Sequence, residues 1–164
     1  MSTYLTILGF NSAIPTVNTS PTAQLLEMEE RCFLIDCGEG TQVQLRKAKA
    51  KFSKINHIFI SHLHGDHCLG LPGLIASFRL LGRDIPLHVY GPKGIKKMLD
   101  TIFSITETHR GFEVIYHELD KNYSEKIYED NRVEVYTIPL DHRIYCNGYL
   151  FKEKPKERHI NIEE

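Results

Sequence analysis

The feature that constrains this chain most is a short run of histidines directly after an apolar segment. Residues 55–61 read INHIFIS, and the next six, 62–67, read HLHGDH. The apolar, β-branched run predicts a strand buried within a sheet. Three imidazoles and one carboxylate packed together are electrostatically unfavourable without a cation. A fold for this chain must therefore place a metal-binding cluster at the end of a buried strand.

The spacing within the run predicts how these side chains bind metal. Alternate residues of an extended segment project to one side, so His62 and His64 can reach the same ion. Gly65 allows the backbone to turn sharply, after which Asp66 and His67 can face a second ion. Imidazole and carboxylate ligands suit Zn²⁺ or a similar first-row metal.

A further candidate ligand lies far along the chain. His142 stands in the sequence PLDHR, at the end of a strand predicted over residues 132–140. A strand end can present a ligand to a neighbouring strand. The other histidines are isolated in the sequence and are interpreted as ordinary core or surface residues: His57, His88, His109, His117 and His159.

The rest of the chain alternates between predicted strands and helices. Strands are predicted over residues 3–8, 23–36 (two strands around a turn at 29–31), 55–61, 85–92, 112–119, 132–140 and 147–154. Helices are predicted over residues 43–52, 70–82 and 94–104. This order predicts an α/β architecture with added antiparallel strands. A length of 164 residues predicts one domain or part of a larger one.

Composition excludes several classes of protein. With 20 basic and 21 acidic residues, the net charge of −1 argues against a protein that coats nucleic acid through bulk charge. No apolar run approaches the roughly 18 residues of a membrane span, and the first residues carry no secretory signal. The four cysteines show no C-x-x-C spacing and are too few for a disulfide scaffold. We therefore expect a cytoplasmic protein.

The segment at 62–67 resembles the H-x-H-x-D-H signature of the metallo-β-lactamase superfamily. Four segments narrow the resemblance to ribonuclease Z, the endonuclease family that trims the 3′ end of precursor transfer RNA. They are LGFNSAIPTVNTSP (8–21), IDCGEGTQVQL (35–45), ISHLHGDHCLGLPGL (60–74) and LDHRIYCNGYLF (140–151). This resemblance implies a metallo-β-lactamase-like αββα sandwich, and a zinc-dependent endoribonuclease that attacks a phosphodiester with hydroxide. It also implies a precursor transfer RNA partner and a homodimer.

The resemblance also implies roles for individual residues. Two zinc ions share the site in the complete enzyme, with manganese as an alternative metal. By this likeness His62, His64 and His142 hold one ion, and Asp66 and His67 hold the other. Asp66 in addition orients the attacking water and acts as general base. Zn²⁺ suits this chemistry because it lowers the pKa of bound water from about 15.7 to about 7.

The family has further ligands and a protruding RNA-binding arm downstream of the matched segments, and residues 1–164 do not contain them. We therefore expect this chain to be the N-terminal portion of a metallo-β-lactamase-like domain. Residues 152–164 are interpreted as the start of the arm or a tail. We expect the isolated chain to be inactive and to hold at most one zinc firmly.

Several secondary interpretations stay open. Glu39 is a candidate partner of a ligand histidine, and Arg143 either binds phosphate or pairs with an acid. The basic run from Arg46 to Lys54 either contacts phosphate or is a solvated helix face. Cys68 is interpreted as a packed residue. Two other functions are consistent with the motif: a hydrolase of esters, thioesters or lactams, and a non-catalytic metal-binding domain that dimerises.

Overall fold

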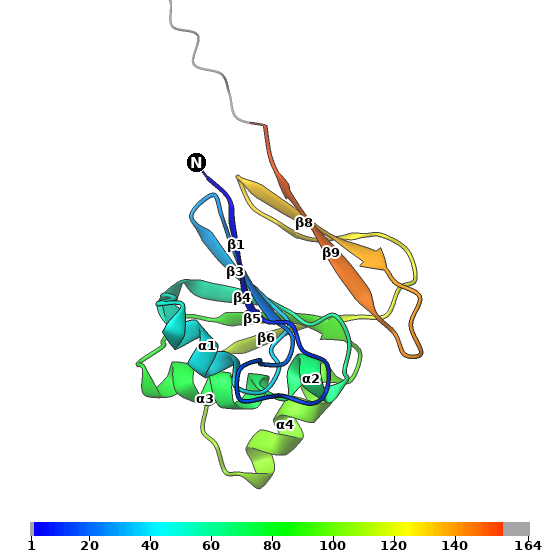
Figure 1. Cartoon of the computed structure of the whole chain (residues 1–164). Coiled ribbons are helices and arrows are strands. Elements are labelled where there is room, and N and C mark those ends of the chain that lie inside the picture. The colour runs from blue at the N-terminus through cyan, green and yellow to red at the C-terminus, as the bar shows by residue number, and fades with distance from the viewer. Residues whose placement is uncertain (1, 156–164) are drawn as a thin grey trace, which may run out of the picture.

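Two β-sheets and a layer of helices make up the structure, a computed structural model that describes residues 2–155 (Figure 1). The first sheet has the order β1-β2-β3-β4-β5-β6. Its strands span Tyr4–Gly9, Ala23–Met28, Arg31–Ile35, Ile55–Phe59, Leu87–Pro92 and Val114–Leu119. The second sheet contains β7, β8 and β9, which span Lys126–Glu129, Val133–Pro139 and Asn147–Glu153.

The first sheet is mixed, and its parallel half determines the helix layer. Strands β1, β2 and β3 are antiparallel neighbours, whereas β3, β4, β5 and β6 run parallel. Parallel neighbours require crossover connections, which are usually helical. Here the crossovers contain helices α1, α2, α3 and α4, which span Thr41–Lys47, Gly65–Cys68, Leu71–Leu80 and Ile95–Ile105. The predicted α/β architecture is confirmed.

The first sheet has a separate apolar core on each face, because successive side chains of a strand point to opposite sides. Leu34 and Ile58 are fully buried in the core on the helix side. Phe33 and Phe59 are fully buried on the other side, in a cluster with Val133 and Val135 of the second sheet. Figure 1 shows all the helices on the outer face of the first sheet. The described residues therefore form an αββ arrangement, the part of the expected αββα sandwich that they contain.

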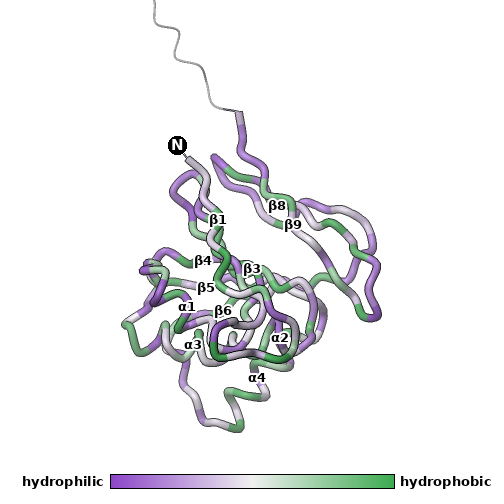
Figure 2. The backbone as a smooth tube through the Cα atoms, viewed as in Figure 1, coloured by the Kyte–Doolittle hydropathy of each residue, from purple (hydrophilic) through white to green (hydrophobic). Residues whose placement is uncertain are grey.

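The hydropathy of the chain follows this layering. In Figure 2 hydrophilic residues gather at the outer turns and towards the end of β9. Within the described part of the chain, no helix combines the length and the apolar character needed to cross a membrane.

The structure differs from the sequence predictions in three places. The helix predicted over 43–52 ends at Lys47, and a 3₁₀ turn, η1, follows over Phe52–Lys54. The helix ends because Lys49 adopts a left-handed backbone conformation with φ 56°, as is typical just after a helix C-terminus. Strand β7 and the one-turn helix α2 are not predicted from the sequence. Strand β9 agrees with the strand predicted over 147–154 and includes residues 152 and 153, where the interpreted arm or tail begins. Residues 156–164, with His159, lie outside the described residues.

Three histidines lie in a row across β4, β5 and β6. The ring centroids of His57 and His88 are 4.9 Å apart, and His88 Nδ1 lies 3.0 Å from His117 Nε2. His57 Nδ1 is buried without a hydrogen-bond partner among the described residues. Burial, followed by the neighbouring charges of His88 and His117, lowers the pKa of His57 to about 4. The row is therefore an uncharged element of the fold at neutral pH.

His57 should make the fold sensitive to acid. Its folded pKa lies below the ordinary value of 6.5, so the unfolded chain binds more protons between about pH 6.5 and 4. The free energy of unfolding should therefore fall as the pH drops through this window, with His57 contributing at most about 3 kcal/mol. Urea unfolding of a His57→Leu variant should show a weaker loss than the parent chain.

The exposed His109 provides a matched control for this measurement. A His109→Leu variant should lose stability with acid as steeply as the parent. If the free energy of unfolding of the His57→Leu variant depended on pH as steeply as that of the parent, the acid sensitivity could not be assigned to His57.

Candidate metal centre

The candidate site lies where strands β3 and β4 end. Because these strands are parallel, their carboxyl ends meet at the same edge of the sheet, the usual location of sites in α/β folds. Asp36 directly follows β3, and its backbone N–H donates to the carbonyl of Phe59 at 2.8 Å. Asp36 adopts a left-handed conformation with φ 56°, which turns the chain sharply out of the strand.

The carboxylate of Asp36 connects two segments of the site. Its Oδ1 accepts from the Ser61 backbone N–H at 2.8 Å, and its Oδ2 accepts from Ser61 Oγ at 2.9 Å. Oδ2 also lies 2.7 Å from His67 Nδ1. A carboxylate only accepts hydrogen bonds, so Nδ1 carries the proton and His67 Nε2 is available as a ligand atom.

The charge state of His67 follows from the same contacts. Burial disfavours the charged ring, but the hydrogen bond to Asp36 and the charges of Asp36 and Asp66 outweigh burial and raise the pKa of His67. A cation placed at Nε2 would benefit from the same negative surroundings.

Backbone segments approach closely behind these side chains. Cys37 N donates to the His67 carbonyl at 2.8 Å, and Gly70 N donates to the Cys37 carbonyl at 2.9 Å. A Cβ on Gly38 would lie 2.4 Å from the Asp66 carbonyl oxygen, and one on Gly70 would lie 2.0 Å from the Gly38 oxygen. Only glycine fits at such distances. The glycine-bearing turn after β3 therefore allows this backbone to lie directly against the histidine segment.

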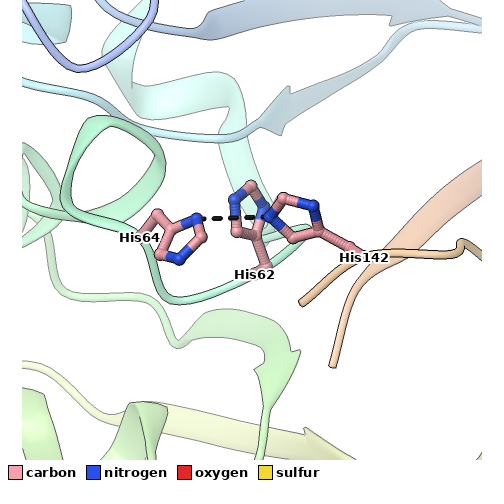
Figure 3. Close-up of side chains that lie close together, drawn as sticks. All are labelled: His62, His64 and His142. Atoms are coloured by element: carbon pink, nitrogen blue, oxygen red, sulfur yellow. Dashed lines mark hydrogen bonds between the residues drawn. The ribbon is translucent and has the colours of Figure 1, made fainter. Parts of the chain in front are cut away.

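Three of the predicted ligands come together. Figure 3 shows His62, His64 and His142 around a common point, and each offers one ring nitrogen within 4.8 Å of the others. His64 Nδ1 lies 3.3 Å from His142 Nε2. His62 is buried, His64 is partly buried and His142 is exposed, so the group is open on one side.

The surroundings of His62 favour its neutral ring. Burial, followed by the nearby His67, lowers the pKa of His62 to about 4, and His64 and His142 act in the same direction. A neutral imidazole keeps a free lone pair, which is the form that binds a metal.

His142 reaches the site because the β8–β9 hairpin is attached to the end of β4. Asn147 N donates to the Ser61 carbonyl at 3.0 Å, and the Tyr149 hydroxyl donates to the Ile60 carbonyl at 2.6 Å. The loop is closed by a hydrogen bond of 3.0 Å from Leu140 N to the Cys146 carbonyl. Hydrogen bonds of the hairpin to the backbone after β4, rather than packing of the histidines themselves, therefore place His142 opposite His62.

Asp66 and His67 lie beside this group. Asp66 Oδ2 is 3.6 Å from His67 Nε2, and the ring centroids of His67 and His62 are 4.0 Å apart. Both residues belong to α2, whose first turn brings them next to the three histidines. The structure thus places all five predicted ligands in one region.

The remaining predicted residues take different positions. Glu39 is exposed and makes no hydrogen bond or ion pair with any described residue, while Asp36 contacts His67. Arg143 is exposed and forms no ion pair within residues 2–155. Cys68 is buried; burial raises its pKa to about 11, and its thiol donates to the His64 carbonyl. The role of Asp36 was missed, although its place after a buried strand was a usable signal.

The arrangement fits a first-row metal ion. Three imidazole nitrogens within 4.8 Å, open to solvent on one side, match a site with three protein ligands and one free position. His67 has the carboxylate partner that ligand histidines usually have.

Comparison with known proteins places this chain in a family. A family model described as Anti-Pycsar protein Apyc1 matches residues 3–142. The chain belongs to this family. The fold of the chain is also similar to that of the metallo-β-lactamase fold protein YhfI of Bacillus subtilis, with a TM-score of 0.69. That match has 18% identity and covers 92% of this chain and 58% of the other.

The predicted resemblance to ribonuclease Z is confirmed. A ribonuclease Z of Bacteroides fragilis is 50% identical over 156 residues, which cover 95% of this chain and 51% of that protein. The crystal structure of human tRNase Z, short form, matches with a TM-score of 0.82 and 34% identity, covering 91% of this chain and 64% of the other. The chain spans about half the length of the curated relatives it matches.

Replacing Asp36 should weaken metal binding without removing a ligand. In an Asp36→Asn variant the carboxylate next to His67 Nδ1 is replaced by a neutral amide. The NH2 group of that amide is a donor and cannot accept the hydrogen bond of Nδ1. Loss of such a partner typically costs 10- to 100-fold in metal affinity. Zinc affinity, measured by competition with a chromogenic chelator, should fall by roughly that factor.

Glu39→Gln is the matched control, since Glu39 is exposed beside the same turn and has no contact with the site. It should leave zinc affinity unchanged. A larger loss in the Glu39 variant than in the Asp36 variant would reverse the assignment of the two carboxylates.

The donor count limits how much metal the isolated chain holds. Three histidines form one group, while Asp66 and His67 supply only two donors to a second. After zinc loading and gel filtration, elemental analysis should find at most one zinc per chain. A His142→Ala variant should lose most of it. Two tightly held zincs per chain would contradict this prediction.

Proposed function

We propose that the whole protein is a metal-dependent endoribonuclease that removes the 3′ trailer of precursor transfer RNA. The observation that carries the proposal is the convergence of His62, His64 and His142 from two distant segments. The substrate class is taken from the relatives named ribonuclease Z and tRNase Z. The description of the matched family names no substrate.

The residues that would hold metal are those of the predicted ligand set. His62, His64 and His142 would hold one ion, and Asp66 and His67 would contribute to a second. Zinc is the proposed metal, with manganese as the alternative. When bound, such an ion polarises phosphoryl oxygen and lowers the pKa of water to about 7.

Asp66 is the proposed general base. Its side chain is only 13% exposed and lies next to the imidazole group, 3.6 Å from His67 Nε2. A carboxylate in this position can orient a water and accept its proton at an Oδ atom. The hydrogen bond from His67 to Asp36 limits rotation of the His67 imidazole, so this ring keeps a fixed position beside Asp66.

Arg143 is the proposed phosphate contact. It follows His142 in the exposed loop and has no carboxylate partner among the described residues. A guanidinium can bind phosphate oxygens in a bidentate manner, so Arg143 can hold the phosphodiester beside the metal centre. The alternative interpretation is that Arg143 pairs with an acidic residue. No such pair forms within residues 2–155.

The isolated chain is proposed to be an incomplete enzyme. It carries five candidate ligands and spans half the length of its ribonuclease Z relatives, so the remaining donors would come from elsewhere in the whole protein. We infer a homodimer acting in the cytoplasm.

The proposal predicts metal-dependent cleavage of RNA by the whole protein. A version with the full length of its relatives should cut a labelled 3′-extended precursor transfer RNA next to the discriminator base with zinc or manganese. It should not cut it with EDTA. An Asp66→Asn substitution should lower the rate at least 100-fold, the usual range for a general base. The 164-residue chain alone should be inactive.

A parallel assay with a small ester and a lactam separates this function from the other hydrolases. Turnover of those compounds with no cleavage of the precursor would contradict the proposal. Metal binding without turnover of any of these substrates would instead favour a non-catalytic domain.

A further inference from the structure

A strongly basic surface lies outside the metal centre. We define the α1–η1 patch by its five members: Arg46, Lys47, Lys49, Lys51 and Lys54. All five are exposed, and no acidic residue occurs in residues 40–65. The chain has a net charge of −1, so the patch is a local excess on a chain that is otherwise acidic on balance.

The charges of this patch are not neutralised by the fold. None of its members forms an ion pair with any residue between 2 and 155. Five lysines elsewhere pair with carboxylates: Lys96, Lys121, Lys126, Lys152 and Lys154. Lys93 and Lys97 are exposed and, like the patch, form no ion pair within residues 2–155, which makes them suitable control positions. A surface of unpaired cations attracts an extended polyanion.

Stabilisation of the C-terminus of α1 accounts for only some of the basic residues in the patch. Arg46 and Lys47 lie in the last turn of α1, where cations stabilise the helix dipole. The guanidinium of Arg46 also lies 5.0 Å from the centroid of the Phe52 ring. Lys51 lies past the helix end, where the dipole effect has faded. Lys49 occupies a left-handed position, φ 56°, where glycine is favoured. Lys49 therefore places a long cationic side chain at a position where its backbone conformation is unfavourable.

The position of the patch suits the substrate of the proposed function. Helix α1 leads from the carboxyl end of β3 back to the start of β4, so its far end lies at the sheet edge opposite the metal centre (Figure 1). Five residues of extended strand correspond to about 15–20 Å. A duplex RNA arm carries phosphates every few ångströms along its length. Such an arm can therefore contact the patch while its end lies at the metal centre.

We propose that the α1–η1 patch binds the sugar–phosphate backbone of the RNA substrate, independently of its sequence. This inference rests on the proposed function. The patch carries no catalytic group, so its contribution is to affinity and to the placement of the RNA arm.

The test uses binding rather than cleavage. Fluorescence anisotropy should follow the 164-residue chain titrated with a labelled RNA hairpin carrying a 3′ extension, at several potassium chloride concentrations. The triple variant Lys47→Ala, Lys49→Gly and Lys51→Ala should bind about 10-fold or more weakly at 50 mM salt. The slope of log affinity against log salt should fall by about 2–3. Glycine at position 49 suits the left-handed backbone, so this variant should keep its fold.

A charge-matched control removes three lysines elsewhere: Lys93→Ala, Lys97→Ala and Lys152→Ala. It should leave both affinity and salt slope close to those of the parent. Equal weakening in the two variants would overturn the proposal, as would unchanged binding in the patch variant or no RNA binding by the parent. Patch-dependent binding to phosphatidylserine vesicles without RNA binding would assign the surface to a membrane instead.

The two proposals fail in different ways. If the patch variant binds RNA normally while the whole protein cleaves the precursor, only the patch proposal is wrong. If RNA binding depends on the patch but the whole protein leaves the precursor intact, the proposed function fails and an RNA-binding surface remains.

Discussion

The carboxylate of Asp36 accepts hydrogen bonds from Ser61 and His67, and the geometry of the metal centre depends on these bonds. Asp36 directly follows β3, Ser61 lies just past β4, and His67 lies in α2, so one buried side chain holds three segments in fixed relation. Burying the Asp36 carboxylate without hydrogen-bond partners would cost free energy, so the fold is favoured only when all three segments are in place. The glycine contacts behind it allow the backbones to approach closely enough for these bonds to form.

The site is assembled from two parts of the chain that only the tertiary fold brings together. The histidine segment follows β4, whereas His142 lies in the β8–β9 loop. The two parts are joined by backbone hydrogen bonds from Asn147 and by the Tyr149 hydroxyl, beside the apolar cluster between the sheets. These hydrogen bonds, made next to the apolar cluster, therefore determine the position of the third imidazole.

The sequence was informative where local rules dominate. The H-x-H-x-D-H spacing after an apolar strand predicted the clustering of His62 and His64, and alternation of strands and helices predicted the α/β architecture with added antiparallel strands. It was less informative where contacts are long-range. Asp36 was passed over in favour of Glu39 because which carboxylate faces His67 depends on the left-handed turn after β3. Strand β7 was missed because its four residues are polar at both ends and pair only with β8.

A metal held by His62, His64 and His142 is the central claim of this account, since the proposed cleavage chemistry starts from it. X-ray absorption spectroscopy at the zinc edge of the loaded 164-residue chain tests it most directly. The account predicts three imidazole nitrogens at about 2.0–2.1 Å and one further light ligand. Fewer than three imidazoles, or a sulfur ligand at about 2.3 Å from a nearby cysteine such as Cys68 or Cys146, would contradict it.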